Sequence, residues 1–466
     1  MNRDAPARGS AYIGFGSLAV LSLLGIITYP AAGLSIMGAA VAAAIIITVR
    51  VDRVALYCGC AALTLLMLVP VQNIGGFGSL KIGVLCAVAA LAVAGALRRW
   101  RSFRDRPAGL WLFLVYLCVL ALATPRSDSP SSWNLLIGAA VAGLSISILF
   151  VLMNPEERKS ALNFVVFLAS CEAAYALFEL VAKRPPLWGY WSVGSSGAPN
   201  IMVNQIDTAL IRSQGTLGHP LPLALLLLAG LALVIRGAGP KRPILRVAVF
   251  GLLAAGCFAA GSRSAMLVAV VLLFLAIGTK RRLIIAGAGS LLLVLTVLIA
   301  AAAGFFQSEV YERFVASDSL SHRNGALDAV PGLLTNQDLV NVAFGNGYYS
   351  APQLFREGML QVGNFYAVDN QAVMTLVEGG LVGLAILATL IVLAIIRIDV
   401  AARMGLLSVA VFFFSFDVLS WPSGMTLFGM FIGLAFSAKK ALNVGASHFE
   451  EQAKPAITTR VASATG

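Results

Sequence analysis

The amino-acid sequence predicts an all-helical membrane protein that crosses the bilayer 12 to 14 times. Of its 466 residues, 59% are hydrophobic and only 12% are charged, whereas water-soluble domains carry about 25% charged residues. Apolar runs of about 17 to 25 residues recur along the chain, and each can cross a hydrocarbon core about 30 Å thick. Helices satisfy their own backbone hydrogen bonds in lipid. The short alternating segments that are typical of transmembrane strands are absent from the sequence.

Fourteen apolar runs define the predicted spans. The first lacks a clear cleavage site and the second follows at once, so we expect it to be a retained helix and not a signal peptide. An even number of spans places both chain ends on the same side of the membrane. The predicted spans are 11–29, 31–49, 54–70, 79–97, 108–124, 135–153, 161–182, 220–236, 244–261, 263–279, 283–304, 369–396, 404–420 and 424–438.

The distribution of basic residues predicts the orientation of these spans. Of the 33 lysines and arginines, 24 fall on the side of the N-terminus and nine on the opposite side or at its membrane edge. Short loops rich in Lys and Arg stay in the cytoplasm. We therefore predict a multi-pass protein with both termini cytoplasmic. The bias holds in every short loop, and one missed helix would disturb it.

The spans divide the chain into six consecutive segments. Two of these are long outer loops, and long loops on a compact membrane body are usually functional. The segments are residues 1–182 (spans one to seven), 183–219 (an outer loop), 220–304 (spans eight to eleven), 305–368 (a large, partly helical outer loop), 369–438 (spans twelve to fourteen) and 439–466 (a cytoplasmic tail that we expect to be disordered).

Several functional classes are not indicated by the sequence. The net charge of +12 orients the helices, so it does not predict nucleic-acid binding. All six cysteines lie in apolar runs, where we expect packing thiols and no disulfide. The sequence has no HExxH, no Walker loop and no CxxC pair, so neither a metal site nor nucleotide hydrolysis is expected.

A set of polar residues is predicted near the outer membrane surface, where such side chains are costly and mark substrate paths. Each also has a structural interpretation: Arg263 can anchor a helix end, Asp369 can cap a helix, and Glu378 can pair with a neighbouring helix. The set consists of Arg212 and His219 before span eight, Arg263 between spans nine and ten, His322 and Arg323 in the large loop, and Asp369 and Asn370 at the start of span twelve, with Glu378 about two and a half turns inside it.

This combination of side chains suits a lipid-linked diphosphate and a hydroxyl acceptor. Arginine is permanently charged and binds phosphate oxygens in a bidentate manner. A carboxylate can take the proton of a hydroxyl group. The glycines of "GTLGHP" and "GSRS" allow the backbone to approach a bulky ligand closely.

Four segments resemble motifs of the O-antigen ligase and O-antigen polymerase superfamily, and the likeness covers residues 200–395. They are "RSQGTLGHPLPLALLL", "GSRSAMLVAVVLL", "RNGALDAVPGLL" followed by "VAFGNGY", and "VDNQAVMTLVEGGLVGLAI", in the order seen in that family. Its members lie in the bacterial inner membrane and transfer glycans from undecaprenyl diphosphate to an acceptor sugar on the periplasmic side. The resemblance implies a GT-C-like helical bundle with a large periplasmic loop as a cap. It also implies an undecaprenyl-diphosphate-linked oligosaccharide donor, and neither a metal nor another cofactor.

The resemblance also implies a diphosphate-binding role for three arginines. Arg212 matches the arginine before the family's G-T-x-x-H-P stretch. Arg263 matches the arginine of a turn similar to S-R-G, and Arg323 matches a loop arginine that precedes a short helix.

The expected base differs from that of the ligase branch. That branch carries a His-Asn pair at the start of the span after the large loop, and its histidine is taken as the base. This sequence has Asp369 and Asn370 there. Asp369 is therefore the expected base, and His322 is the alternative. We expect His219, Asn370 and Glu378 to position the donor or the acceptor.

The leading hypothesis is a metal-independent, inverting glycosyltransferase that polymerises repeat units of a surface polysaccharide or exopolysaccharide. Its expected partners are the lipid bilayer and the growing glycan. A polymerase of this kind can also work with a chain-length regulator. One alternative is a ligase-type transferase that moves a lipid-linked glycan to a lipid or protein acceptor. Another class is a flippase or transporter for lipid-linked sugars, which would need charges near the middle of the membrane. A structural membrane subunit is the last alternative.

Overall fold

A computed structural model describes residues 40–41, 44, 48–49, 53–70, 78–99, 108–190, 201–205, 209–276, 325–360 and 368–437. Within these residues the chain is helical, apart from turns and one isolated antiparallel bridge between Val203 and Ile211. The predicted spans 11–29 and 283–304, and most of 31–49, lie outside the described residues.

Six helices are long and apolar enough to cross a membrane, which confirms a multi-pass helical architecture. Five shorter apolar helices accompany them. The longer ones are α4 (Gly78–Arg98), α6 (Ala108–Ala123), α7 (Ser132–Val151), α8 (Pro155–Ala182), α10 (Pro243–Ala260) and α18 (Gln371–Arg397), and the shorter ones are α3 (Val54–Leu68), α9 (Pro220–Ile235), α11 (Arg263–Ala276), α19 (Val400–Phe412) and α20 (Pro422–Phe436).

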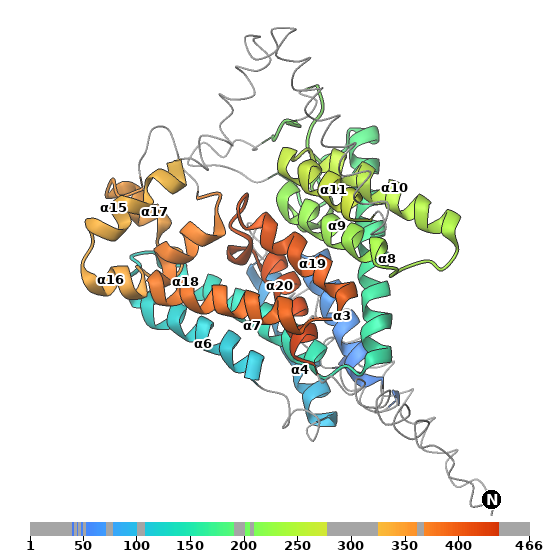
Figure 1. Ribbon diagram of the computed structural model, residues 1–466, viewed down its shortest axis with the longest axis horizontal. Coiled ribbons are helices and arrows are strands. Elements are labelled where there is room, and N and C mark those ends of the chain that lie inside the picture. The colour runs from blue at the N-terminus through green and yellow to red at the C-terminus, as the bar shows by residue number, and fades with distance from the viewer. Residues whose placement is uncertain are drawn as a thin grey trace, which may run out of the picture.

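Two apolar helices, α9 and α20, form the centre of the bundle. Nearly every residue of both is buried. Helix α9 packs against α8, α10 and α19, while α20 packs most closely on α7 (Figure 1). At Gly429 of α20 an added Cβ would lie only 2.5 Å from the carbonyl oxygen of Gly143 in α7. The two backbones therefore meet directly, as small residues permit between membrane helices.

One end of the bundle is held by ion pairs between the predicted cytoplasmic loops. Arg99 pairs with the fully buried Glu157 at 2.6 Å, and Arg158 pairs with Asp399 at 3.1 Å. Glu157 also completes a capping box with Asn154 at the start of α8. These loops were predicted to share one side of the membrane, and the structure brings them together.

The large outer loop contributes three short helices beside α18, on the side of the bundle opposite α9, α10 and α11 (Figure 1). They are α15 (Val330–Thr335), α16 (Leu339–Phe344) and α17 (Ala351–Arg356).

The predicted twelfth span forms the single element α18, which is broken at Gly380. This residue has φ 64° and ψ −165°, a conformation that favours glycine. At the break, the carbonyl groups of Val377 and Glu378 accept hydrogen bonds from Asn346 N (2.8 Å) and Gly347 N (3.1 Å). The loop after α16 thus replaces the missing helical bonds, as a break at membrane depth requires.

The predicted thirteenth span, residues 404–420, is longer than the helix that forms. Helix α19 ends at Phe412, and residues 413–417 make a turn before a short 3-10 helix, η4 (Val418–Ser420). Gln371 stabilises this turn from α18. Its N–H donates to Phe413 O at 2.7 Å, and its Oε1 accepts from Leu419 N at 2.6 Å. Satisfied backbone groups let the chain leave the helix early.

Candidate functional site

The loop that carries Arg212 and His219 is held by two buried glutamates of α8. Glu179 Oε2 accepts hydrogen bonds from the N–H groups of Gln214 and Gly215, both at 3.0 Å. Glu172 accepts from Thr216 N at 2.9 Å and from Thr216 Oγ1 at 2.5 Å. Carboxylate oxygens thus satisfy backbone groups that would otherwise be buried without a partner.

Arg212 and Arg263 join this loop to the turn between α10 and α11. Arg212 Nε donates to Ala260 O at 2.9 Å, and Arg263 Nε donates to Gln205 O at 2.9 Å. Arg212 is only 8% exposed, and its Nη2 has no hydrogen-bond partner among the described residues. The two arginine-bearing segments are therefore in direct contact.

The guanidinium of Arg212 interacts electrostatically with Asp369 at the start of α18. Burial lowers the pKa of Arg212 to about 10, and the charge of Asp369 opposes that shift. Arg212 remains a cation at neutral pH, so the structure provides a buried positive charge beside a carboxylate.

His219 is the N-cap of α9, and its Nδ1 accepts the Leu221 N–H at 3.2 Å. Its ring lies 4.7 Å from the ring of Trp421 and is stacked on Phe416 at 6.2 Å, measured between centroids. Burial and the charge of Arg212 lower the pKa of His219 to about 3. His219 is therefore a neutral side chain that connects α9 to the turn before α20.

Asp369 does not cap α18, although the sequence allowed that structural interpretation. Asn370, not Asp369, is the N-cap, and its Oδ1 accepts from Ala372 N (2.9 Å) and Val373 N (3.2 Å). Asp369 precedes the N-cap by one position. Its half-buried side chain lies at a cavity instead.

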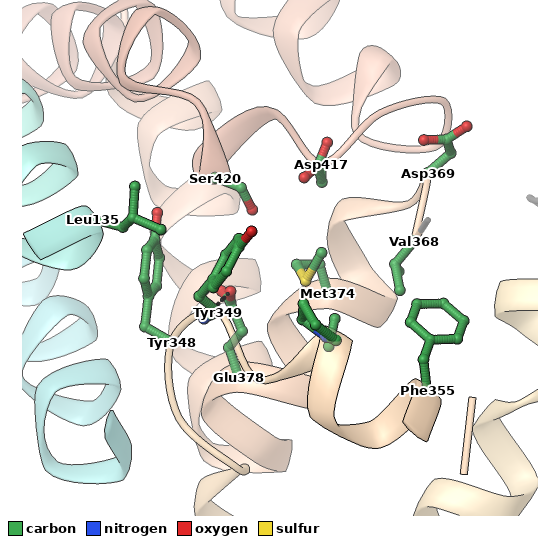
Figure 2. Close-up of a pocket in the computed structure, with 12 residues that line it drawn as sticks. Leu135, Tyr348, Tyr349, Phe355, Val368, Asp369, Met374, Glu378, Asp417 and Ser420 are labelled. Atoms are coloured by element: carbon green, nitrogen blue, oxygen red, sulfur yellow. Dashed lines mark hydrogen bonds between the residues drawn. The ribbon is translucent and has the colours of Figure 1, made fainter. Parts of the chain in front are cut away.

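A cavity of about 360 Å³ opens between α17, the start of α18 and the turn before α20. Figure 2 shows Asp369 and Asp417 along one rim, with Glu378 across from them. The lining residues are Leu135, Tyr348, Tyr349, Ala351, Pro352, Phe355, Val368, Asp369, Met374, Glu378, Asp417 and Ser420.

Asp417 is the lining carboxylate that the sequence prediction missed. It lies in the turn after α19, and its Oδ1 accepts a hydrogen bond from Trp421 Nε1 at 3.2 Å. Burial and the charge of Asp369 raise the pKa of Asp417 to about 8. A signal was present, because this acidic residue falls inside the predicted span 404–420, where a carboxylate indicates a functional site.

Glu378 lines the same cavity from α18, just before the break at Gly380. Its side chain is 2% exposed, and Oε1 accepts the N–H of Tyr349 at 2.9 Å. Tyr349 has φ 60°, which is rare for a residue with a side chain. The structure therefore places Glu378 against the large loop rather than against a neighbouring membrane helix alone.

The structure brings together four of the predicted residues, Arg212, His219, Asp369 and Asn370, and places Glu378 in the adjoining cavity. Arg263 lies at the turn that contacts the Arg212 loop. His322 and Arg323 lie outside the described residues. Within the described part of the chain, no three His, Cys, Asp or Glu side chains are arranged to hold a metal ion.

No protein-family model matches this chain, and no curated protein matches its sequence.

Proposed function

We propose that this protein is a membrane glycosyltransferase that polymerises glycan repeat units from a lipid-linked diphosphate donor at the outer membrane face. One observation carries the proposal: the buried Arg212 guanidinium interacts with Asp369, which lines a cavity rich in carboxylates and aromatic rings. Glycan transfer from a diphosphate to a hydroxyl group requires a fixed cation that stabilises the leaving diphosphate. It also requires a nearby group that accepts the hydroxyl proton.

Arg212 is suited to the donor because its Nη2 is free of hydrogen bonds to the described residues. It also lines a second cavity, of about 250 Å³, together with Lys183, Arg184 and Tyr190. The lining also includes the Glu179 carboxylate. The three basic side chains outnumber it and favour an anion, and guanidinium groups bind phosphate oxygens in a bidentate manner. We assign the donor diphosphate to this region.

The first cavity is suited to the acceptor. Tyr348, Tyr349 and Phe355 offer aromatic surface, and Asp369, Asp417 and Glu378 offer hydrogen-bond acceptors. Pockets that combine apolar walls with a few polar groups bind small ligands in a fixed orientation. A sugar unit presents both kinds of surface, because its ring has apolar C–H faces and a rim of hydroxyl groups.

The proposed reaction is a single displacement with inversion. The acceptor oxygen attacks the anomeric carbon of the donor, and the bond from that carbon to the diphosphate breaks. Arg212 stabilises the negative charge that develops on the leaving group. Asp369 lines the proposed acceptor cavity and interacts with Arg212, so in this proposal it holds the guanidinium and orients the acceptor hydroxyl.

The test compares polymer length in a host that lacks its own copy of the gene and carries plasmid-borne variants. Arg212→Ala and Arg212→Lys should each lower polymer output about tenfold or more, because lysine keeps the charge and loses the bidentate geometry. Arg356→Lys is the matched control, since Arg356 forms an exposed ion pair with Asp128.

The products distinguish the alternatives. A ladder of repeat units that disappears in Arg212→Ala supports a polymerase. Transfer of one preassembled glycan to a lipid or protein, with no change in ladder length, supports the ligase alternative. Normal polymer in Arg212→Ala at normal membrane levels would contradict both.

A further inference from the structure

Asp417 has a fixed position in the proposed acceptor cavity. It lines the cavity with Asp369 and Glu378 (Figure 2). Trp421 Nε1 donates to its Oδ1 at 3.2 Å, and the Trp421 ring packs on His219. The Trp421 ring also packs on Phe416, so two ring contacts independent of Asp417 hold the indole in place, and its N–H sets the direction of the Asp417 carboxylate.

The charges around the cavity are distributed unevenly between the two aspartates. Asp369 interacts with the cationic Arg212. Asp417 faces Asp369, Glu378 and the Tyr348 hydroxyl, and it forms no ion pair with a described residue. Nearby negative charge favours the protonated form of a carboxyl group. Of the two, Asp417 has the environment that favours taking up a proton.

Glu378 indicates that the cavity receives a polar ligand. Glu378 is buried, with 2% of the residue exposed, and one carboxylate oxygen accepts the Tyr349 N–H. The carboxylate also borders the cavity, where a ligand hydroxyl can donate a hydrogen bond to it.

We propose that Asp417 accepts the proton of the acceptor hydroxyl and that Asp369 is a positioning residue for Arg212. This inference rests on the proposed transferase function. In the step, a bond forms between the acceptor oxygen and the anomeric carbon, while the bond from that carbon to the diphosphate oxygen breaks. The electron pair of the broken bond leaves with the diphosphate. The hydroxyl proton moves to the Asp417 carboxylate, which releases it to water after the product departs.

The proton affinity of Asp417 agrees with this role. A base is most effective when its pKa lies near the working pH, and the pKa of Asp417 is raised to about 8 by burial and by Asp369. Asp417 is active when deprotonated, so the transfer rate should rise with pH up to about 8.

The test measures transfer and donor-site binding separately, on purified full-length protein in lipid nanodiscs. Transfer is followed with the lipid-linked donor extracted from the host, and binding is measured with farnesyl diphosphate as the probe. Asp417→Asn should lower the transfer rate about 10²-fold or more, abolish its rise between pH 6 and 8, and leave probe binding unchanged. Asp369→Asn should weaken probe binding and keep a rise with pH, shifted to lower pH because the charge of Asp369 no longer raises the pKa of Asp417. Asp399→Asn is the control, because Asp399 pairs with Arg158 at the opposite end of the bundle.

Three results separate this inference from the proposed function. Full transfer by Asp417→Asn, or loss of the pH dependence in Asp369→Asn instead, would overturn the role of Asp417 and leave the transferase function intact. Failure of the wild-type protein to bind the probe or transfer glycan would overturn the proposed function itself. Where Asp417→Asn does not accumulate, Asp417→Glu replaces it. Glutamate moves the carboxyl group by one methylene, so slow transfer that still rises with pH supports the inference, and wild-type rates contradict it.

Discussion

The ring of His219 packs against the indole ring of Trp421, with centroids 4.7 Å apart and planes inclined by 38°. His219 caps α9 and Trp421 precedes α20, so this contact joins two central helices that are distant in the sequence. Because Trp421 also donates to Asp417, the pair connects the Arg212 loop to the cavity.

The Trp421 contact predicts a separation between catalytic and packing effects. Trp421→Phe keeps an aromatic ring against His219 and removes the N–H that orients Asp417. We expect transfer to fall several-fold, by about 1 kcal/mol in activation free energy for one lost hydrogen bond, with little change in melting temperature. Trp421→Ala should instead destabilise the protein by about 3 to 5 kcal/mol. Fluorescence-detected size-exclusion thermal scans and transfer assays on both variants provide the check. Wild-type transfer by Trp421→Phe at wild-type stability would argue against an orienting role.

The break in α18 predicts that Gly380 cannot be replaced. Gly380→Ala would put a side chain at positive φ and force Cβ against the Ala343 carbonyl group. We expect a loss of about 1 to 3 kcal/mol of stability from the backbone strain alone. Displacement of the loop that contacts Glu378 should also lower polymer output.

Gly251→Ala in α10 is the matched control for this prediction. An added Cβ at Gly251 meets nothing within 4 Å, and alanine favours a helix by about 1 kcal/mol over glycine. The comparison is the melting temperature of the two variants in detergent. If Gly380→Ala melts at the wild-type temperature, the break does not depend on glycine.

Burial of neutral His219 predicts a loss of stability in acid. Burial and the charge of Arg212 lower its folded-state pKa to about 3, from the ordinary histidine value of 6.5. The unfolded chain therefore takes up the proton first as the pH falls below 6.5. The His219 contribution is present above that pH and is lost progressively towards pH 3, by about 2 kcal/mol at pH 5.

His219→Asn isolates this effect, because asparagine can also cap α9 and does not titrate in this range. We expect the melting temperature of the wild type to fall more steeply between pH 7 and pH 5 than that of the variant. Parallel curves for the two proteins would show that the His219 ring can be protonated in place.

The orientation in the membrane is tested by cysteine labelling. Leu339 lies in the large loop and is 85% exposed, while Glu156 lies at the predicted cytoplasmic end with 83% of its side chain exposed. An impermeant maleimide should label Leu339→Cys in intact cells and Glu156→Cys only after permeabilisation, with the wild-type chain as the baseline. The reverse pattern would invert the topology.

The sequence by itself determined where most helices run. Predicted spans such as 220–236 and 244–261 agree with α9 (Pro220–Ile235) and α10 (Pro243–Ala260) within a residue or two. Helix boundaries follow from local chemistry, because proline is favoured in the first turn and apolar runs partition into lipid. The sequence also indicated that Arg212, Arg263 and Asp369 share one end of the bundle, since the side of each loop follows from counting spans.

Only the tertiary structure decided how the site is assembled. It assigned the α18 cap to Asn370 and left Asp369 at the cavity, although either residue type caps a helix well. It ended α19 at Phe412 because Gln371, from another helix, satisfies the turn that holds Asp417. Such choices depend on hydrogen bonds between residues far apart in the chain, and hydropathy carries no information about those partners. Hydropathy therefore places a segment in the bilayer, whereas side-chain contacts between helices decide which carboxylates face one another.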